Sequence, residues 1–238
     1  DVPHPENSID PVRDWNIVEM ELIFRDLGVI ENRISRLQAK KKNIPSETEE
    51  KALLERCQAC LLEERPLREL GLSPDELRLL SGFAFVTLKP ELIVANLDET
   101  QTDDSLPLLN ALRELAKTKG IRLLRIFGKM EMELTELPEE EQKEFMGELG
   151  IEESGRNRLI SEAYALLGLL SFFTTGKDEV RAWTLVKGAN AVDAAGAIHS
   201  DLARGFIRAQ VVSYEDFISH EQSLAKCREK GVLRLEGK

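Results

Sequence analysis

The chain is poor in the residues that form disulfide frameworks and histidine-based active sites. Its 238 residues include three cysteines and three histidines. One cysteine would remain unpaired after any bridge formed, so the sequence excludes a disulfide scaffold and favours a reducing, cytoplasmic location. His4, His199 and His220 have no serine or cysteine partner at the spacing of a catalytic triad, so the sequence does not support histidine catalysis. We expect His199 to lie at the surface or to cap a helix.

Long apolar runs are also absent. The longest, Ala163 to Phe173, is interrupted by Gly168 and falls short of the roughly 18 apolar residues that a membrane span requires. No signal-peptide pattern is present, and we expect no membrane contact. The formal net charge of -11 argues against a surface that binds nucleic acid throughout, although it is compatible with a local basic patch.

A phosphate-binding loop is missing from these residues. The nearest match is Gly176-Lys177, but the pattern G-x-x-x-x-G-K-[ST] also requires glycine at position 171 and serine or threonine at position 178. The chain has Ser171 and Asp178 instead. Cys57 and Cys60 have the C-x-x-C spacing of metal and redox sites, but no second pair lies near them. Zinc needs four ligands, so core packing is favoured over a metal or redox role.

The chain does contain an apolar run that ends in polar residues. The stretch from Glu91 to Glu99 is a run of β-forming residues that follows Pro90 and ends in polar side chains from Asn96 onward. This pattern predicts a strand that is buried on both faces. Ligands bind beyond the carboxyl ends of such strands in open α/β sheets. The polar end is therefore either a simple turn or part of a site.

A second strand is predicted to bring more polar residues to the same place. Residues 105–119 read as an amphipathic helix and residues 121–127 as another apolar strand, which makes a βαβ unit with parallel neighbouring strands. Gly128 and Lys129 then follow the second strand at the sheet edge where Asn96 ends the first. The fold class is therefore α/β, and the shared edge favours the functional interpretation.

Two helices are expected before this unit. Asp10-Pro11 predicts the start of the first, and Ser46 with Glu49 predicts a capping box for the second. The two helices can pack as an antiparallel hairpin. The expected apolar stripe of the first helix is Ile17, Met20, Phe24, Leu27, Ile30, Ile34 and Leu37. The expected stripe of the second is Leu54, Cys57 and Leu61.

The end of this hairpin is basic within an acidic chain. The basic residues are Arg33, Arg36, Lys40, Lys41 and Lys42. They are either a solvated helix end or a surface that contacts nucleic-acid phosphates by charge attraction.

The pattern changes near residue 172, where we place a domain boundary. A helix is predicted from about residue 154 to residue 173, and a small α+β module follows it. The elements predicted for this module are a strand at 179–186, a helix at 190–202, a strand at 206–213, a helix at 214–230 and a strand at 232–236.

At this point the chain resembles a known family. Residues 179–184, 194–201, 204–209 and 214–217 resemble the C-terminal TGS domain of the YchF family, which are Obg-related P-loop nucleotidases of the translation-factor class. Asp10 to Asp14, Thr87 to Pro90 and Phe172 to Gly176 match the same family in the same order. The resemblance covers essentially the whole chain.

The resemblance implies a domain organisation. Residues 1–12 would be a remnant of the nucleotide-binding domain, and residues 13–85 an inserted α-helical coiled-coil arm. Residues 86–171 would be the C-terminal half of the P-loop NTPase domain, and residues 172–238 a truncated, β-grasp-like TGS domain. We expect a fragment, because the family's P-loop and switch segments would precede Asp1 and its last TGS strands would follow Lys238.

The resemblance also implies site residues. In this family the base-recognition motif is N-x-x-E, whereas ordinary GTPases have N-K-x-D. Asn96, Leu97 and Glu99 match the family's motif. A preference for ATP over GTP accompanies this change, because the Asp of N-K-x-D accepts two hydrogen bonds from guanine and adenine lacks that donor pair. Gly128 and Lys129 match the second base-contacting loop, in which Phe127 departs from the usual small polar residue.

The implied function is that of a ribosome-associated nucleotide-binding protein. The intact protein would bind and hydrolyse ATP or GTP with Mg²⁺, act with RNA or the ribosome, and be a monomer. We expect no catalytic or metal-binding residue in this chain and no ATP hydrolysis by it alone, because hydrolysis needs phosphate and Mg²⁺ contacts. One alternative is a non-catalytic RNA- or ribosome-binding module. Another is a purely structural helical protein.

Overall fold

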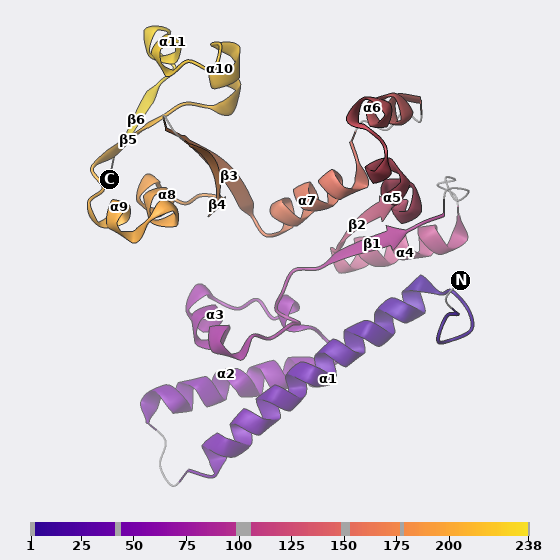
Figure 1. Ribbon diagram of the computed structural model, residues 1–238. Coiled ribbons are helices and arrows are strands. Elements are labelled where there is room, and N and C mark those ends of the chain that lie inside the picture. Colours follow the sequence, from indigo (N-terminus) through magenta and orange to yellow (C-terminus); the bar gives the residue numbers. More distant parts are fainter. Residues whose placement is uncertain (1–2, 41–43, 99–105, 149–152, 177–178, 238) are drawn as a thin grey trace. The chain divides into compact units, whose positions relative to one another are not determined.

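The computed structural model describes residues 3–40, 44–98, 106–148, 153–176 and 179–237. The chain divides into two compact units, Asp1–Leu159 and Ile160–Lys238. The first contains two long helices and a parallel pair of strands, and the second contains two antiparallel pairs of strands (Figure 1).

Two long helices, α1 (Pro11–Gln38) and α2 (Pro45–Leu62), pack against each other in the first unit (Figure 1). Their facing side chains form the main hydrophobic core together with the residues that follow α2. Burial of each leucine, isoleucine or phenylalanine among them contributes about 1.5–3 kcal/mol. The core residues are Ile23, Ile30, Ile34, Leu37, Leu53, Leu54, Cys57, Cys60, Leu61, Leu67, Leu80 and Phe85. The predicted stripe of the second helix is therefore confirmed.

The buried face of α1 is only partly the predicted one. Members of the predicted stripe that are buried are Ile30, Ile34 and Leu37. Ile17 and Phe24 are 45% and 57% exposed, so their predicted burial is wrong. The side chains buried on this part of the helix are Glu19, Ile23 and Asp26. Two carboxylates are tolerated here because residues after α2 provide their hydrogen-bond donors.

Glu19 is held at the end of the helical pair nearest the sheet. Arg68 in η1 (Leu67–Glu69) donates to the Glu19 carboxylate at 2.5 Å and lies 2.8 Å from the Glu91 carboxylate. Trp15 donates to the other oxygen of Glu91. Burial raises the pKa of Glu19, although the charge of Arg68 opposes this. This network joins α1 to the residue that precedes the first strand.

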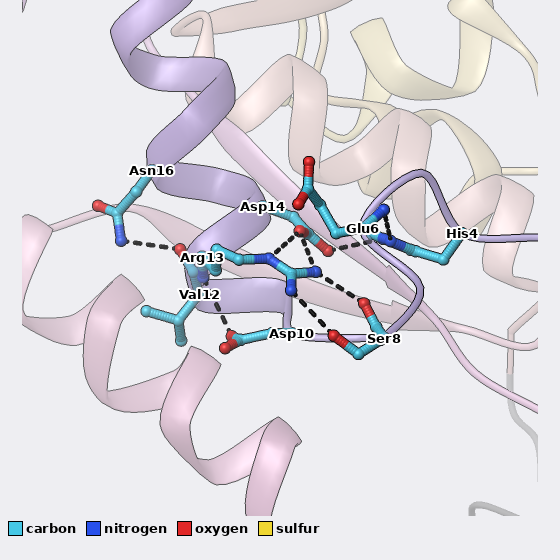
Figure 2. A network of polar contacts seen from close by, with 8 residues as sticks. All are labelled: His4, Glu6, Ser8, Asp10, Val12, Arg13, Asp14 and Asn16. Carbon is cyan, nitrogen blue, oxygen red and sulfur yellow. Dashed lines mark hydrogen bonds and ion pairs between the residues drawn. The ribbon is translucent and has the colours of Figure 1, made fainter.

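The N-terminus of α1 is capped as the sequence predicts. The Asp10 carboxylate accepts a hydrogen bond from the Arg13 backbone N–H at 3.0 Å, and Pro11 occupies the first turn. Figure 2 shows the Arg13 guanidinium donating to Asp14 at 2.8 Å and His4 approaching the other Asp14 oxygen at 2.9 Å. Burial acts to raise the pKa of Asp14, but the hydrogen bonds and charges of Arg13 and His4 together lower it.

The cap of α2 lies two residues before the predicted one. Pro45 takes the first helical position, and Ile44 is the cap. The Glu47 carboxylate accepts from the Ile44 backbone N–H at 3.3 Å. The predicted capping box of Ser46 and Glu49 is therefore wrong, because the fixed φ of proline starts the helix one residue before the serine. After α2 and η1 come α3 (Pro74–Leu80) and η2 (Ser81–Phe83).

The predicted βαβ unit is confirmed. Strands β1 (Leu92–Asn96) and β2 (Arg122–Ile126) are parallel, and α4 (Pro107–Lys119) connects them and packs on both β2 and α1. Val94 is 38% exposed, so the predicted burial of β1 on both faces is wrong within this unit. The register pairs Asn96 with Ile126 at the carboxyl ends.

Three helices follow: α5 (Gly128–Glu136), α6 (Glu139–Glu148) and α7 (Gly155–Leu166). The helix predicted to reach Phe173 stops at Leu166. Gly168 adopts φ +62°, which an L-residue rarely adopts, and strand β3 (Leu169–Thr175) begins directly after it. Pairing with a following strand, rather than the local leucine content, decides the structure there.

In the second unit, β3 pairs antiparallel with β4 (Val180–Val186), and β5 (Arg208–Val211) pairs antiparallel with β6 (Arg234–Gly237). The two predicted helices are each divided into two. The resulting four are α8 (Ala191–Ile198), α9 (Ser200–Arg204), α10 (Tyr214–Ser219) and α11 (Leu224–Glu229). His199 marks the first division, where its Nδ1 accepts from the Asp201 backbone N–H at 3.2 Å, so its expected capping role is confirmed.

Candidate functional site

The two polar strand ends meet at one edge of the β1–β2 sheet. The Asn96 side chain accepts a hydrogen bond through Oδ1 from the backbone N–H of Gly128 at 2.9 Å. The contact joins the last residue of β1 to the first residue of α5. The predicted meeting of Asn96 and Gly128 is therefore present in the structure.

The absence of a side chain at Gly128 leaves space for the Asn96 side chain. A Cβ atom at this position would lie 2.9 Å from Asn96 Oδ1 and 3.4 Å from Asn96 Cγ. Asn96 is exposed, and because its Oδ1 is occupied, its Nδ2 is the group free to donate to a ligand. The site thus presents a fixed side-chain donor at the end of a strand.

The other predicted site residues that the structure describes have fewer contacts with Asn96 and Gly128. The Leu97 backbone N–H donates to the Ile126 carbonyl at 2.9 Å, and the Leu97 side chain is half-buried. Lys129 is exposed and lies 3.9 Å from the Glu133 carboxylate one turn further along α5. Glu99 lies outside the described residues. The structure therefore brings Asn96, Leu97 and Gly128 together, whereas the Lys129 side chain extends along its own helix.

Glu131, in the first turn of α5, is held by a second contact. Its carboxylate accepts from the backbone N–H of Gly155, at the N-terminus of α7, where the helix dipole favours a negative charge. A Cβ at Gly155 would lie 2.7 Å from Glu131 Oε1 and 3.3 Å from Ile126 Cγ2. The segment from Gly128 to Glu131 is thus held by Asn96 at one end and by α7 at the other.

A cavity of about 510 Å³ lies beside this segment. Its lining includes Gly128 and Glu131 from α5, Gln142 from α6 and Asn157 from α7. The edge formed by Asn96 and Gly128, with this cavity next to it, offers hydrogen-bonding groups of the kind that bind the polar edge of a purine. Within the described ranges, no group of three or more His, Cys, Asp or Glu side chains could hold a metal ion. The groups at this edge are of a kind that can bind a base.

The basic cluster of the helical pair is partly neutralised. The Arg33 guanidinium donates to both Glu50 oxygens, at 2.6 and 2.8 Å, and this hydrogen bonding raises the pKa of Arg33. Lys40 donates to Glu47 at 2.5 Å. Arg36 is exposed in the last turn of α1. Lys41 and Lys42, the remaining members, lie outside the described residues.

The cysteine pair belongs to the core, as predicted. Cys57 and Cys60 of α2 are buried in the main hydrophobic core. Burial, assisted by the neighbouring Cys60, raises the pKa of Cys57 to about 11. A reactive thiol needs the opposite shift. Among the helices described, none is both long and apolar enough to cross a membrane.

Two contacts around the candidate site could not be predicted from the sequence. Glu131 and Gly155 are 24 residues apart, and no local pattern relates them. The only signal is that Gly155 stands where a helix begins. Arg158, one turn further along α7, donates to the Arg125 carbonyl of β2 at 2.6 Å and was not anticipated either.

Comparisons with known proteins relate the chain to one group of proteins. The family model YchF-GTPase_C, described as a protein of unknown function (DUF933), matches residues 169–238. The "Ribosome-binding ATPase YchF" of Haemophilus influenzae is 40% identical over 239 residues, which cover 100% of this chain and 65% of that protein. The protein of the same name from Bacillus subtilis is 38% identical over 241 residues, with coverage of 100% and 65%.

A solved structure gives the same result. The YchF GTPase of Schizosaccharomyces pombe superimposes with a TM-score of 0.85 at 28% identity, and it covers 100% of this chain and 65% of that one. The chain thus spans about two thirds of the length of its relatives. Sequence identity over the whole chain, the matching family model and the shared α/β fold lead to one conclusion: the chain belongs to the YchF family.

Proposed function

We propose that this chain carries the base-recognition half of a nucleotide site. In a protein of the relatives' full length, that site binds and hydrolyses ATP or GTP with Mg²⁺ in association with the ribosome. The observation that carries the proposal is the hydrogen bond between Asn96 and Gly128 at the shared edge of β1 and β2. The names of the relatives, ribosome-binding ATPase and GTPase, support it.

The geometry suggests how the base is read. With its Oδ1 bound to Gly128, the Asn96 amide donates through Nδ2 to an acceptor such as N7 of a purine. Leu97, in place of the lysine of N-K-x-D, offers an apolar surface instead of a charge. Glu99, in place of aspartate, completes the motif. We assign ATP as the preferred nucleotide, because the donor pair of guanine lacks its usual aspartate.

The domain assignment follows the same proposal. Residues 1–12 and 86–171 belong to the nucleotide-binding domain, and residues 13–85 form the coiled-coil arm that interrupts it. Residues 172–238 are the TGS domain. The arm contacts ribosomal RNA through the basic residues at the end of the helical pair, chiefly Arg36, since Glu50 and Glu47 occupy Arg33 and Lys40.

A chimera tests the proposal. The parts of the Bacillus subtilis relative that this chain does not match are joined to the corresponding ends of the chain, and nucleotide affinity is measured by calorimetry with Mg²⁺. We expect the chimera to bind ATP more tightly than GTP, and the double substitution Leu97→Lys with Glu99→Asp to reverse that order. The 238-residue chain alone is expected to show no Mg²⁺-dependent ATP hydrolysis.

Co-sedimentation with ribosomes separates this proposal from the alternative. If the chimera binds ribosomes but no nucleotide, the chain is a non-catalytic RNA- or ribosome-binding module. If the chimera gains nucleotide binding while its ribosome association equals that of the chain alone, the two parts have separate roles. Equal affinity for ATP and GTP in both the chimera and its double variant would refute the role given to Asn96, Leu97 and Glu99.

A further inference from the structure

A second cavity, of about 390 Å³, lies between β2 and the helices α4 and α7. Its charged lining consists of four cationic side chains, Arg113, Lys117, Arg125 and Arg158. Among the described residues, no aspartate or glutamate lines it. Four cations around one cavity are unexpected in a chain of formal net charge -11. The charged residues that line the cavity are therefore all cationic, although the chain as a whole is acidic.

Arg158 combines a backbone contact with an unpartnered buried donor. Its Nη2 donates to the Arg125 carbonyl at 2.6 Å, which fixes the guanidinium against β2. Its Nε is buried and has no hydrogen-bond partner in the described part of the chain. Buried polar groups almost always have a partner, so this donor indicates that an acceptor binds beside it.

The helix on the other side of the cavity contributes a second pair of cations. Arg113 and Lys117 are four residues apart on α4 and therefore share one face, an arrangement in which like charges repel. Arg113 also donates to Asn110 at 3.1 Å. Because Arg113 and Arg125 take part in other polar contacts, the inference depends on Arg158 and on the exposed Lys117.

We propose that this cavity binds a small phosphate-bearing molecule through its phosphate group. The planar fork of a guanidinium matches phosphate oxygens, and the cavity volume lies at the lower end of the range for small-molecule sites. Leu123 and Leu124 of β2 provide an apolar wall for the remainder of the ligand. Asn96 and Gly128 do not line this cavity, so the site is separate from the proposed base site.

Calorimetric titration of the full chain with pyrophosphate and with inorganic phosphate, at constant ionic strength, tests this site. We expect saturable binding to the wild type and about tenfold weaker binding to Arg158→Gln. Lys117→Gln, an exposed position on α4, should also weaken binding and should leave the fold intact. Arg156→Gln is the matched control for Arg158→Gln, because it removes one positive charge from α7, the helix of Arg158, and Arg156 does not line this cavity.

Three outcomes of this titration would contradict the phosphate site. Absence of saturable binding to the wild type, or equal affinity in the wild type, Arg158→Gln and Lys117→Gln, would overturn the proposal. A short single-stranded RNA that binds with dependence on Arg158, when pyrophosphate does not bind, would also overturn it and would identify a nucleic-acid surface. Thermal melts of each variant show whether a loss of binding reflects unfolding, and in that case the Lys117→Gln result decides.

Discussion

Asp26 and Thr87 are the most completely buried polar pair in the first unit. One Asp26 oxygen accepts from the Thr87 hydroxyl at 2.7 Å and from the Thr87 backbone N–H at 2.8 Å. The other accepts from the Val86 backbone N–H at 3.2 Å and from Arg25 at 2.7 Å. Both side chains have zero relative exposure. The carboxylate thus ties the middle of α1 to the chain that leads into β1.

Asp26→Ala should be strongly destabilising. It leaves the Val86 and Thr87 backbone donors buried without an acceptor, and we expect a loss of about 2–4 kcal/mol in the free energy of unfolding. Urea unfolding followed by circular dichroism measures it. Glu21→Ala, at an exposed position of the same helix, should change the free energy by less than about 0.5 kcal/mol. Equal effects of the two substitutions would show that the buried carboxylate is not a structural anchor.

The cysteine pair should make stability depend on pH in the alkaline range. The pKa of Cys57 rises from 9.0 to about 11 on folding, so the folded state favours the protonated thiol. That contribution is complete below about pH 9 and is lost as the pH rises towards 11. Unfolding free energies measured from pH 8 to pH 10.5 should fall more steeply in the wild type than in Cys57→Ala. Parallel pH profiles for the two proteins would contradict the shift.

Alanine at two glycines should have opposite effects. Gly155→Ala places a methyl group against Glu131 Oε1 and Ile126 Cγ2, so we expect destabilisation of about 1–2 kcal/mol. Gly147, in α6, has no atom within 4 Å of a built Cβ, and Gly147→Ala should stabilise by about 0.5–1 kcal/mol through helix propensity. Thermal unfolding of both variants checks the signs. Stabilisation by Gly155→Ala would mean that the contact between α5 and α7 is loose.

The proposed arm makes a prediction about individual arginines. Arg36→Ala should reduce ribosome co-sedimentation and its dependence on salt more than Arg33→Ala does, because Glu50 already engages Arg33. Arg33→Ala should instead lower the stability of the helical pair. Arg78→Ala, an exposed arginine on α3, is the control for a general loss of positive charge. A larger loss of binding with Arg33→Ala than with Arg36→Ala would contradict this order.

The sequence predicted the elements whose cause is local. Asp10-Pro11 starts α1 as expected, and the alternation of strand, helix and strand yields the parallel pair that brings Asn96 to Gly128. The predicted resemblance to the YchF family is confirmed by relatives of about 40% identity. In each case a short run of residues contains enough information, because caps, prolines and periodicity act within a few positions.

The failures have a common physical origin in contacts between distant residues. Apolar periodicity placed Ile17 and Phe24 in the core, whereas Asp26 is buried there because Thr87, 61 positions away, supplies its donors. The helix predicted through Phe173 ends because β3 finds a partner in β4. A local sequence pattern does not indicate which distant residue will be the partner.

The most direct test of the central claim separates the base from the phosphates. In the chimera, Asn96→Ala should weaken ATP binding about tenfold or more, through loss of a base contact, and leave the affinity for tripolyphosphate unchanged. Asn32→Ala, an exposed asparagine of α1 that bonds to the Gly28 carbonyl, should affect neither ligand. Equal weakening of ATP and tripolyphosphate by Asn96→Ala, or no effect on ATP, would contradict the assignment of Asn96 to base recognition.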